Sequence, residues 1–197
     1  MFLFAWGIVL QLESRLGLAP WDVLHQGIAR HTPLSFGVAN IVVGVVVLSI
    51  AWALGGAPGL GTIANAVLIG LFIQLFTSFH AVTSLAHDGL SARIPLLVAG
   101  ICLIGPGTAF YIGADFGAGP RDTLMLVGAR RTGVRVGAVR GTIEVSALLA
   151  GIALGGTFGV GTVAFALLVG PVVETSFWLL ERSPLAFAEP VAPALSP

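Results

Sequence analysis

A stretch without a single charged side chain separates Arg30 from Asp88 and is the strongest constraint on the fold. It holds 57 residues. A helix needs about 20 mostly apolar residues to cross the hydrocarbon core of a bilayer. Glycine and proline crowd positions 55–61, near the middle of the stretch, and these residues interrupt helices. The stretch therefore predicts two transmembrane helices, at about 35–55 and 61–80, joined by a tight turn.

The composition of the whole chain indicates the same class of protein. Of its 197 residues, 56% are hydrophobic and 9% are charged, whereas a soluble domain carries about 25% charged residues. So few charges cannot cover a water-facing surface, which excludes a soluble globular enzyme, and the apolar content excludes a disordered chain. A net charge of zero without a basic stripe excludes a nucleic-acid partner, so the expected partner is the lipid bilayer.

Further apolar runs complete the prediction of an all-α, polytopic membrane protein with six transmembrane helices. Three runs are long enough to cross, at about 94–114, 136–154 and 161–180. The N-terminal run, residues 1–12, would be a sixth span but is too short to cross unaided. We interpret it as truncated by a misplaced start codon or as part of a fragment; the alternative is a short span that thins the bilayer locally. The tail, residues 182–197, is rich in Pro and Ala and predicts a disordered cytoplasmic end.

An internal repeat organises these spans. Residues 17–74 align with 117–174 without a gap, at an offset of 100, and 21 of the 58 positions are identical. Each copy reads as a span, a short polar segment, a span, a glycine turn and a span. Because three is an odd number, tandem copies must have opposite orientations in the membrane, an arrangement that recurs in transporters. We therefore expect two inverted three-helix repeats, residues 1–80 and 94–181.

The placement of arginine predicts the orientation, because cytoplasmic loops carry an excess of basic residues. All nine basic residues are arginine. The side that holds 114–135 and the C-terminus carries Arg121, Arg130, Arg131, Arg135 and Arg182. The other side carries Arg15, Arg30 and Arg93. The first side is therefore expected in the cytoplasm, with both termini inside.

A Pro-x-Asp motif opens the short polar segment of each copy, at 20–22 and 120–122. Proline suits the first helical turn, where its missing N–H would be unpaired anyway, and an aspartate there complements the helix dipole. Short helices are therefore predicted at 20–31 and 120–131, on opposite sides of the membrane, with their aspartates on opposite leaflets. Each is either an interfacial helix that caps itself or a re-entrant half-helix with its N-terminus aimed at an anion or a shared cavity.

Ionisable residues inside predicted spans are the other candidates for chemistry. Arg140 and Glu144 are four residues apart in the fifth span and share one face, and Glu174 lies in the sixth. Charges inside a bilayer are costly and normally face a protein interior or a water-filled cavity. The pair is either structural, with Arg140 reaching the interface, or part of a site that binds substrate or carries a proton. The predicted substrate-binding set is Asp22, Asp122, Asn40, Arg140, Glu144 and Glu174.

Familiar catalytic chemistry is missing from the sequence. The repeated Gly-x-Gly-Thr at 59–62 and 159–162 lacks the lysine of a phosphate loop and predicts tight helical hairpins instead. The four histidines, His25 among them, have no metal-site spacing and are predicted at surfaces or interfaces. Signatures of hydrolases and metalloproteases do not occur. We therefore expect no enzyme activity, no metal and no cofactor.

One combination of motifs is more specific. A Gly-x-x-Pro-Trp-Asp-Val-Leu segment follows an apolar span, and a span with Gly-x-Gly-Thr-x-x-Asn-Ala comes later; their residues are Gly17, Pro20, Trp21, Asp22, Gly59, Gly61, Thr62, Asn65 and Gly70. Over about residues 3–180 the chain resembles the YczE/YitT-type family of small bacterial integral membrane proteins. The second half departs from the pattern, with Arg121 for Trp21 and Phe165 for Asn65. The resemblance implies a multi-spanning protein of the bacterial plasma (inner) membrane, and no reaction or substrate.

These features lead us to expect a secondary transporter or small-solute permease, with a site at the repeat interface for a small molecule or an ion. A non-transporting scaffold or regulatory protein is the first alternative, and a passive channel formed by two half-helices is the second. The sequence also leaves a homo-oligomer open. A water-filled cavity reached by Arg140 and Glu144 would favour transport or conduction, whereas a dry centre packed with Gly and Ala would favour a scaffold.

Overall fold

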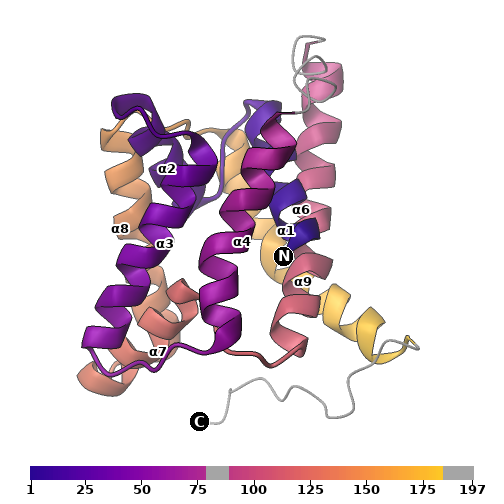
Figure 1. Ribbon diagram of the computed structural model, residues 1–197. Helices are drawn as coiled ribbons and strands as arrows, with labels where there is room; N and C mark the ends of the chain where they lie inside the picture. Colours follow the sequence, from indigo (N-terminus) through magenta and orange to yellow (C-terminus); the bar gives the residue numbers. More distant parts are fainter. Residues whose placement is uncertain (79–88, 184–197) are drawn as a thin grey trace.

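Eight α-helices make up the computed structural model within residues 1–78 and 89–183, the parts of the chain that the structure describes (Figure 1). In chain order they are α1 (Phe2–Ser14), α2 (Pro20–His31), α3 (Phe36–Ala53), α4 (Leu60–Thr77), α6 (Leu90–Gly113), α7 (Pro120–Thr132), α8 (Val136–Ala153) and α9 (Val160–Glu181). The predicted disordered tail, from residue 184 onward, and residues 79–80 of the second predicted span lie outside the described residues.

Five of these helices are long and apolar enough to cross a membrane: α3, α4, α6, α8 and α9. Helix α1 has 13 residues and is shorter than a span. The short helices α2 and α7 begin at Pro20 and Pro120, as predicted, with Asp22 and Asp122 in their first turns. An all-helical membrane protein is thus confirmed, whereas six crossings and inverted repeats stay predictions.

Helix α6 begins at Leu90, four residues before the predicted start of its span, and this extension takes Arg93 into the helix. The guanidinium of Arg93 donates to the carbonyl oxygen of Ser14, 2.7 Å away, and to that of Arg15, 2.6 Å away. These carbonyls lie at the C-terminal end of α1, where the helix leaves them without partners in its own backbone. The charge that limits the apolar run therefore has a structural role, and the helix continues through it.

The centre of the molecule is a close contact between α1 and α6. A Cβ added to Gly7 would lie 2.7 Å from the carbonyl oxygen of Gly100, and one added to Gly107 would lie 2.7 Å from the Phe4 nitrogen. Small residues of this kind let two helix backbones approach closely, as is typical of membrane proteins. Helix α4 packs on α1, and α9 packs on α6. The apolar core around this contact contains Ala5, Ile8, Val9, Ile69, Ile73, Phe76 and Ile104.

Each half of the chain holds the short helix of the other half. Helix α2 packs on α8, and α7 packs on α3. The Gly61 N–H donates to the Phe116 carbonyl oxygen at 2.7 Å, and the Gly161 N–H donates to that of Leu16 at 2.8 Å. Gly61 corresponds to Gly161 at the repeat offset of 100, and Leu16 corresponds to Phe116 at the same offset. The two bonds are therefore equivalent, each running from one half to the other. Figure 1 shows α2 near one end of the molecule and α7 near the opposite end.

The two halves differ where their long helices meet. Helix α3 packs against α4, and a Cβ added to Gly70 would lie 2.5 Å from the Gly37 carbonyl oxygen. At the equivalent positions of α8 and α9, a Cβ added to Gly137 or Gly170 would meet no described atom within 4 Å. We call the α8–α9 boundary the open seam. Glu144 lies in it at the position that corresponds to Gly44 in the first half, so a long side chain occupies this boundary.

The glycine pair at equivalent positions, Gly70 and Gly170, tests this difference. We expect Gly70→Ala to lower the free energy of unfolding by about 1–3 kcal/mol, because its methyl group would overpack the contact with Gly37. Gly170→Ala should be neutral or stabilising by up to about 1 kcal/mol, because alanine is the better helix former and the space is open. Thermal unfolding of both variants in detergent measures the difference, and an equal loss of stability would contradict the open seam.

Candidate binding cavity between the two halves

A cavity of about 380 Å³ lies where the two halves meet, and side chains from all eight helices line it. The N-termini of α2 and α7 both reach it. The Arg121 guanidinium of α7 lies over the Trp21 ring of α2, with 4.8 Å between its carbon and the ring centroid. Of the two interpretations of the short helices, the geometry therefore favours half-helices with N-termini at a shared cavity over isolated surface helices.

The polar residues of the first half form a closed cluster. The His25 Nδ1 atom lies 3.1 Å from Asp22 Oδ1 and 3.2 Å from Asn40 Nδ2. His25 is 1% exposed and Asp22 is 3% exposed. The prediction of His25 at a surface or interface is therefore wrong. The spacing of three residues between Asp22 and His25 on one helix was the signal for this contact.

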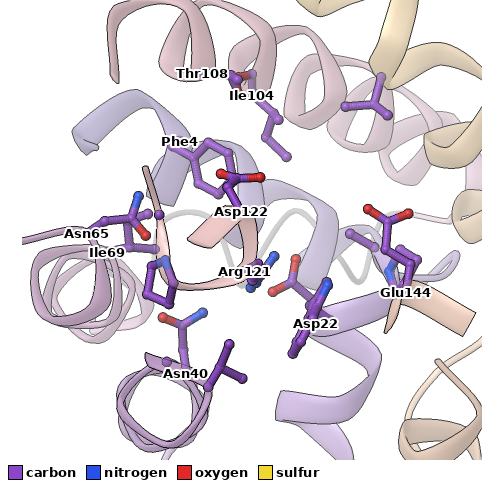
Figure 2. Close-up of a pocket in the computed structure, with 18 of the residues that line it drawn as sticks. Phe4, Asp22, Asn40, Asn65, Ile69, Ile104, Thr108, Arg121, Asp122 and Glu144 are labelled. Carbon is purple, nitrogen blue, oxygen red and sulfur yellow. The ribbon is translucent and has the colours of Figure 1, made fainter. Parts of the chain in front are cut away.

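A second group of polar side chains, from α4, α6 and α7, is gathered near Gly119 without such bonds. A Cβ added to Gly119 would lie 2.8 Å from Tyr111 Oη, 3.3 Å from Asp122 Oδ2 and 3.4 Å from Asn65 Oδ1, so three oxygens closely approach the same glycine. The Tyr111 hydroxyl is buried and makes no hydrogen bond of ordinary geometry. Within the described chain, the side chains of Asp122 and Asn65 make none either, and Figure 2 shows both at the cavity.

The Arg140–Glu144 pair lies at the edge of the cavity, on α8 at the open seam. Arg140 Nε lies 3.0 Å from Glu144 Oε1, and the two side chains are 59% and 39% exposed. Both line the cavity together with Ala166 and Gly170 of α9, so the cavity reaches the surface of the protein between α8 and α9. Figure 2 shows the Glu144 carboxylate beside the cavity.

Burial shifts the ionisable groups of α2 and α7, which are not among the membrane-crossing helices. It lowers the pKa of His25, and the hydrogen bond to Asp22 opposes this shift. It raises the pKa of the Asp122 carboxyl, and the charges of Arg140 and Arg121 oppose that shift.

Five of the six predicted site residues line the one cavity: Asp22, Asp122, Asn40, Arg140 and Glu144. Glu174 does not line it and is exposed on α9. The expectation that Asp22 and Asp122 lie on opposite leaflets stays a prediction, although both residues line the same cavity. Their helices come from opposite ends of the molecule, but the N-termini converge. Their role in binding a substrate stays a prediction.

The sequence interpretation missed two features of this cavity. The first is the stacking of Arg121 on Trp21, although the exchange of these residue types between the repeats was visible in the alignment. The second is Tyr111, an aromatic residue in an apolar span with no signal of its own. Within residues 1–78 and 89–183, no group of three His, Cys, Asp or Glu side chains could hold a metal ion.

Comparisons with known proteins identify relatives of the chain. A sequence model described as "Family of unknown function (DUF6198)" matches residues 1–176. An "Uncharacterized protein" of Haemophilus influenzae is 37% identical over 171 residues, which cover 87% of this chain and 77% of the relative. The "Uncharacterized membrane protein YczE" of Bacillus subtilis is 34% identical over 178 residues, or 89% of this chain and 81% of the relative. No solved structure matches.

The closed cluster around His25 makes a prediction for stability. We expect His25→Leu to lower the free energy of unfolding by about 1–3 kcal/mol, because the buried Asp22 carboxylate would lose the N–H donor of His25. His31→Leu, on the exposed end of the same helix, is the control and should change stability little. Differential scanning fluorimetry in detergent gives both values, and similar shifts for the two variants would argue against a structural role for the cluster.

Proposed function

Because the chain belongs to the DUF6198 family, described as of unknown function, we propose from its own geometry that it is a secondary transporter or small-solute permease. The substrate would bind in the cavity between the two halves. One observation carries this proposal: a cavity with charged and polar groups in a mostly apolar lining, at the convergence of α2 and α7 and reached by the ion pair of Arg140 and Glu144. Substrate sites at the interface of repeats, formed by broken helices, are a recurring feature of secondary transporters.

A scaffold or regulatory protein accounts less well for this centre. Buried polar groups without hydrogen bonds cost free energy, and a protein that only held a partner would gain nothing from them. The Tyr111 hydroxyl is such a group, and the half-buried side chains of Asp122 and Asn65 approach Gly119 beside it without hydrogen bonds of their own. A binding function gives these groups partners in the loaded state, which supports a site over a packed, dry centre.

The repeated contacts between the halves support an inverted topology. The hydrogen bonds from Gly61 to Phe116 and from Gly161 to Leu16 recur at the offset of the sequence repeat. We propose two inverted three-helix repeats with both termini in the cytoplasm, in the bacterial plasma membrane. Arg121 lines the cavity and is not a flanking charge, which leaves Arg130, Arg131, Arg135 and Arg182 against Arg15, Arg30 and Arg93. Four arginines on the one side against three on the other still predict that the side with Arg130 and the C-terminus is cytoplasmic.

A passive channel is the second candidate, because two half-helices meeting N-terminus to N-terminus also suit a conduction path. The open seam distinguishes the two in part. An asymmetric cavity that reaches the surface beside α8 and α9 is what one access state of a transporter would present. A channel would conduct in proportion to the solute gradient, whereas a transporter would saturate and show exchange of solute across the membrane.

Purified protein in liposomes, challenged with amino acids, organic acids, organic cations and sugars, tests the transport proposal. A pH-sensitive dye inside the vesicles and radiolabelled solutes report uptake. We expect saturable uptake of at least one solute, and we expect Glu144→Gln to abolish uptake or its proton coupling while leaving membrane insertion intact. Glu174→Gln is the matched control, because Glu174 is a carboxylate of a membrane-crossing helix that does not line the cavity.

Two results would count against this role. One is near-normal uptake after both Arg140 and Glu144 are replaced by apolar residues, which would make the pair merely structural. The other is the absence of uptake of every solute class, which would return the scaffold to first place.

Reporter fusions test the topology. We expect alkaline phosphatase fused after Arg30 to be active, because that end would be periplasmic or extracellular, and green fluorescent protein fused after Arg130 to be fluorescent in the cytoplasm. A fusion in the turn at 54–59 is the control and should behave like the one after Arg130. Fusions at 30 and 130 that report the same side would exclude inverted repeats.

A further inference from the structure

Two of the charged side chains that line the cavity have no close polar partner among the described residues. Asp22 lies against His25, and Glu144 pairs with Arg140. The remaining charges are Arg121 and Asp122, which both line the cavity. Among the described residues, neither has a salt bridge within 4 Å or a side-chain hydrogen bond, and the contact of Arg121 is the Trp21 ring.

Arg121 and Asp122 form no salt bridge with each other, because consecutive residues on a helix point apart. An α-helix has 3.6 residues per turn, so adjacent side chains point in directions about 100° apart and do not face each other. The guanidinium lies over the Trp21 ring, whereas the carboxylate lies near Tyr111 and Asn65 around Gly119. Figure 2 shows Arg121 and Asp122 at separate places in the cavity. The cavity therefore presents a positive group and a negative group at two separate places.

From this arrangement, we propose that the ligand of the cavity is a small amino acid, with its carboxylate at Arg121 and its ammonium group at Asp122. The inference rests on the proposed function and names the substrate class of that same site. A simple anion would leave Asp122 without a close partner, and a simple cation would leave Arg121 without one. A charge that is partly removed from water without a partner is unfavourable, which makes a ligand with both charges the best match.

The groups around each charge agree with an amino acid. Asp122 Oδ2, Tyr111 Oη and Asn65 Oδ1 come from residues that line the cavity and approach Gly119 together, and an ammonium group has three donors for such oxygens. A guanidinium offers several N–H donors in a plane that suits a carboxylate. Ile69, Val43 and Val169 are among the apolar lining residues, so a small aliphatic side chain would also find partners.

Thermal stabilisation of the purified protein in lipid nanodiscs tests this class directly, without any transport step. The probes are glycine, L-alanine, β-alanine and L-valine, with propionate as alanine without its ammonium group and ethylamine as alanine without its carboxylate. Glycine betaine keeps both charges but has no N–H donor. We expect at least one amino acid to bind at least about tenfold more tightly than propionate, ethylamine or betaine, since each of these lacks one charge-assisted contact.

Variants assign each end of the ligand. We expect Arg121→Gln and Asp122→Asn each to weaken amino-acid binding by about tenfold or more. The matched controls, Arg130→Gln and Asp115→Asn, change the same charges outside the cavity and should bind as the unaltered protein does. Binding should also change the fluorescence of Trp21, because a carboxylate would draw Arg121 off its ring, and Trp21→Phe should remove that signal.

Two results would overturn the proposal. One is that no amino acid binds; the other is that propionate or ethylamine binds as tightly as alanine. Saturable, Glu144-dependent uptake of a sugar or of a singly charged solute would leave the transporter standing and exclude the amino acid. Amino-acid binding with no uptake would support the ligand and count against transport.

Discussion

A helix that begins inside a membrane protein must find partners for backbone groups that water cannot reach, and the arrangement of the two halves follows from this constraint. Proline at the first position of α2 and α7 removes one donor from each. The loops before them are then held by the other half: Leu18 donates to the Thr157 carbonyl oxygen, and Thr62 donates to that of Ala118. The partners come from the other repeat, so the halves are interleaved and the half-helices meet at the centre.

On this nearly symmetric backbone the side chains are not symmetric. The first half closes its polar groups on one another through Asp22, His25 and Asn40. The second half has methionine at the position of His25, and Asp122 has no such neighbour. The same backbone position thus carries a structural aspartate in one copy and an unsatisfied one in the other.

Sequence patterns predicted the helices well because each depends on local information. Uncharged runs located the long helices, Pro-x-Asp located the starts of α2 and α7, and a spacing of four predicted the contact of Arg140 with Glu144. Features that depend on distant contacts could not be predicted in this way. Trp21 and Arg121 come together because the loop before each short helix is hydrogen-bonded to the other half of the chain.

Glu174 does not line the cavity because it lies one position along α9 from a residue that does. Val169 and Val173 of α9 line the cavity, and Glu174 follows Val173 directly, so its side chain points about 100° away from that face. The sequence placed Glu174 in the right span but could not give the rotation of that span. Only packing of α9 on α6 fixes it.

The exchange of loops between the halves also has a consequence for biosynthesis. Helix α2 needs α8 as its packing surface and the 157 region as its partner for Leu18, yet these segments are synthesised more than 100 residues later. The first half can therefore enter the membrane but cannot reach its final form until the ribosome has nearly finished the second. During that interval the polar start of α2 is without its packing partner. It must lie in lipid, at the membrane surface or beside the insertion machinery until that partner has been synthesised.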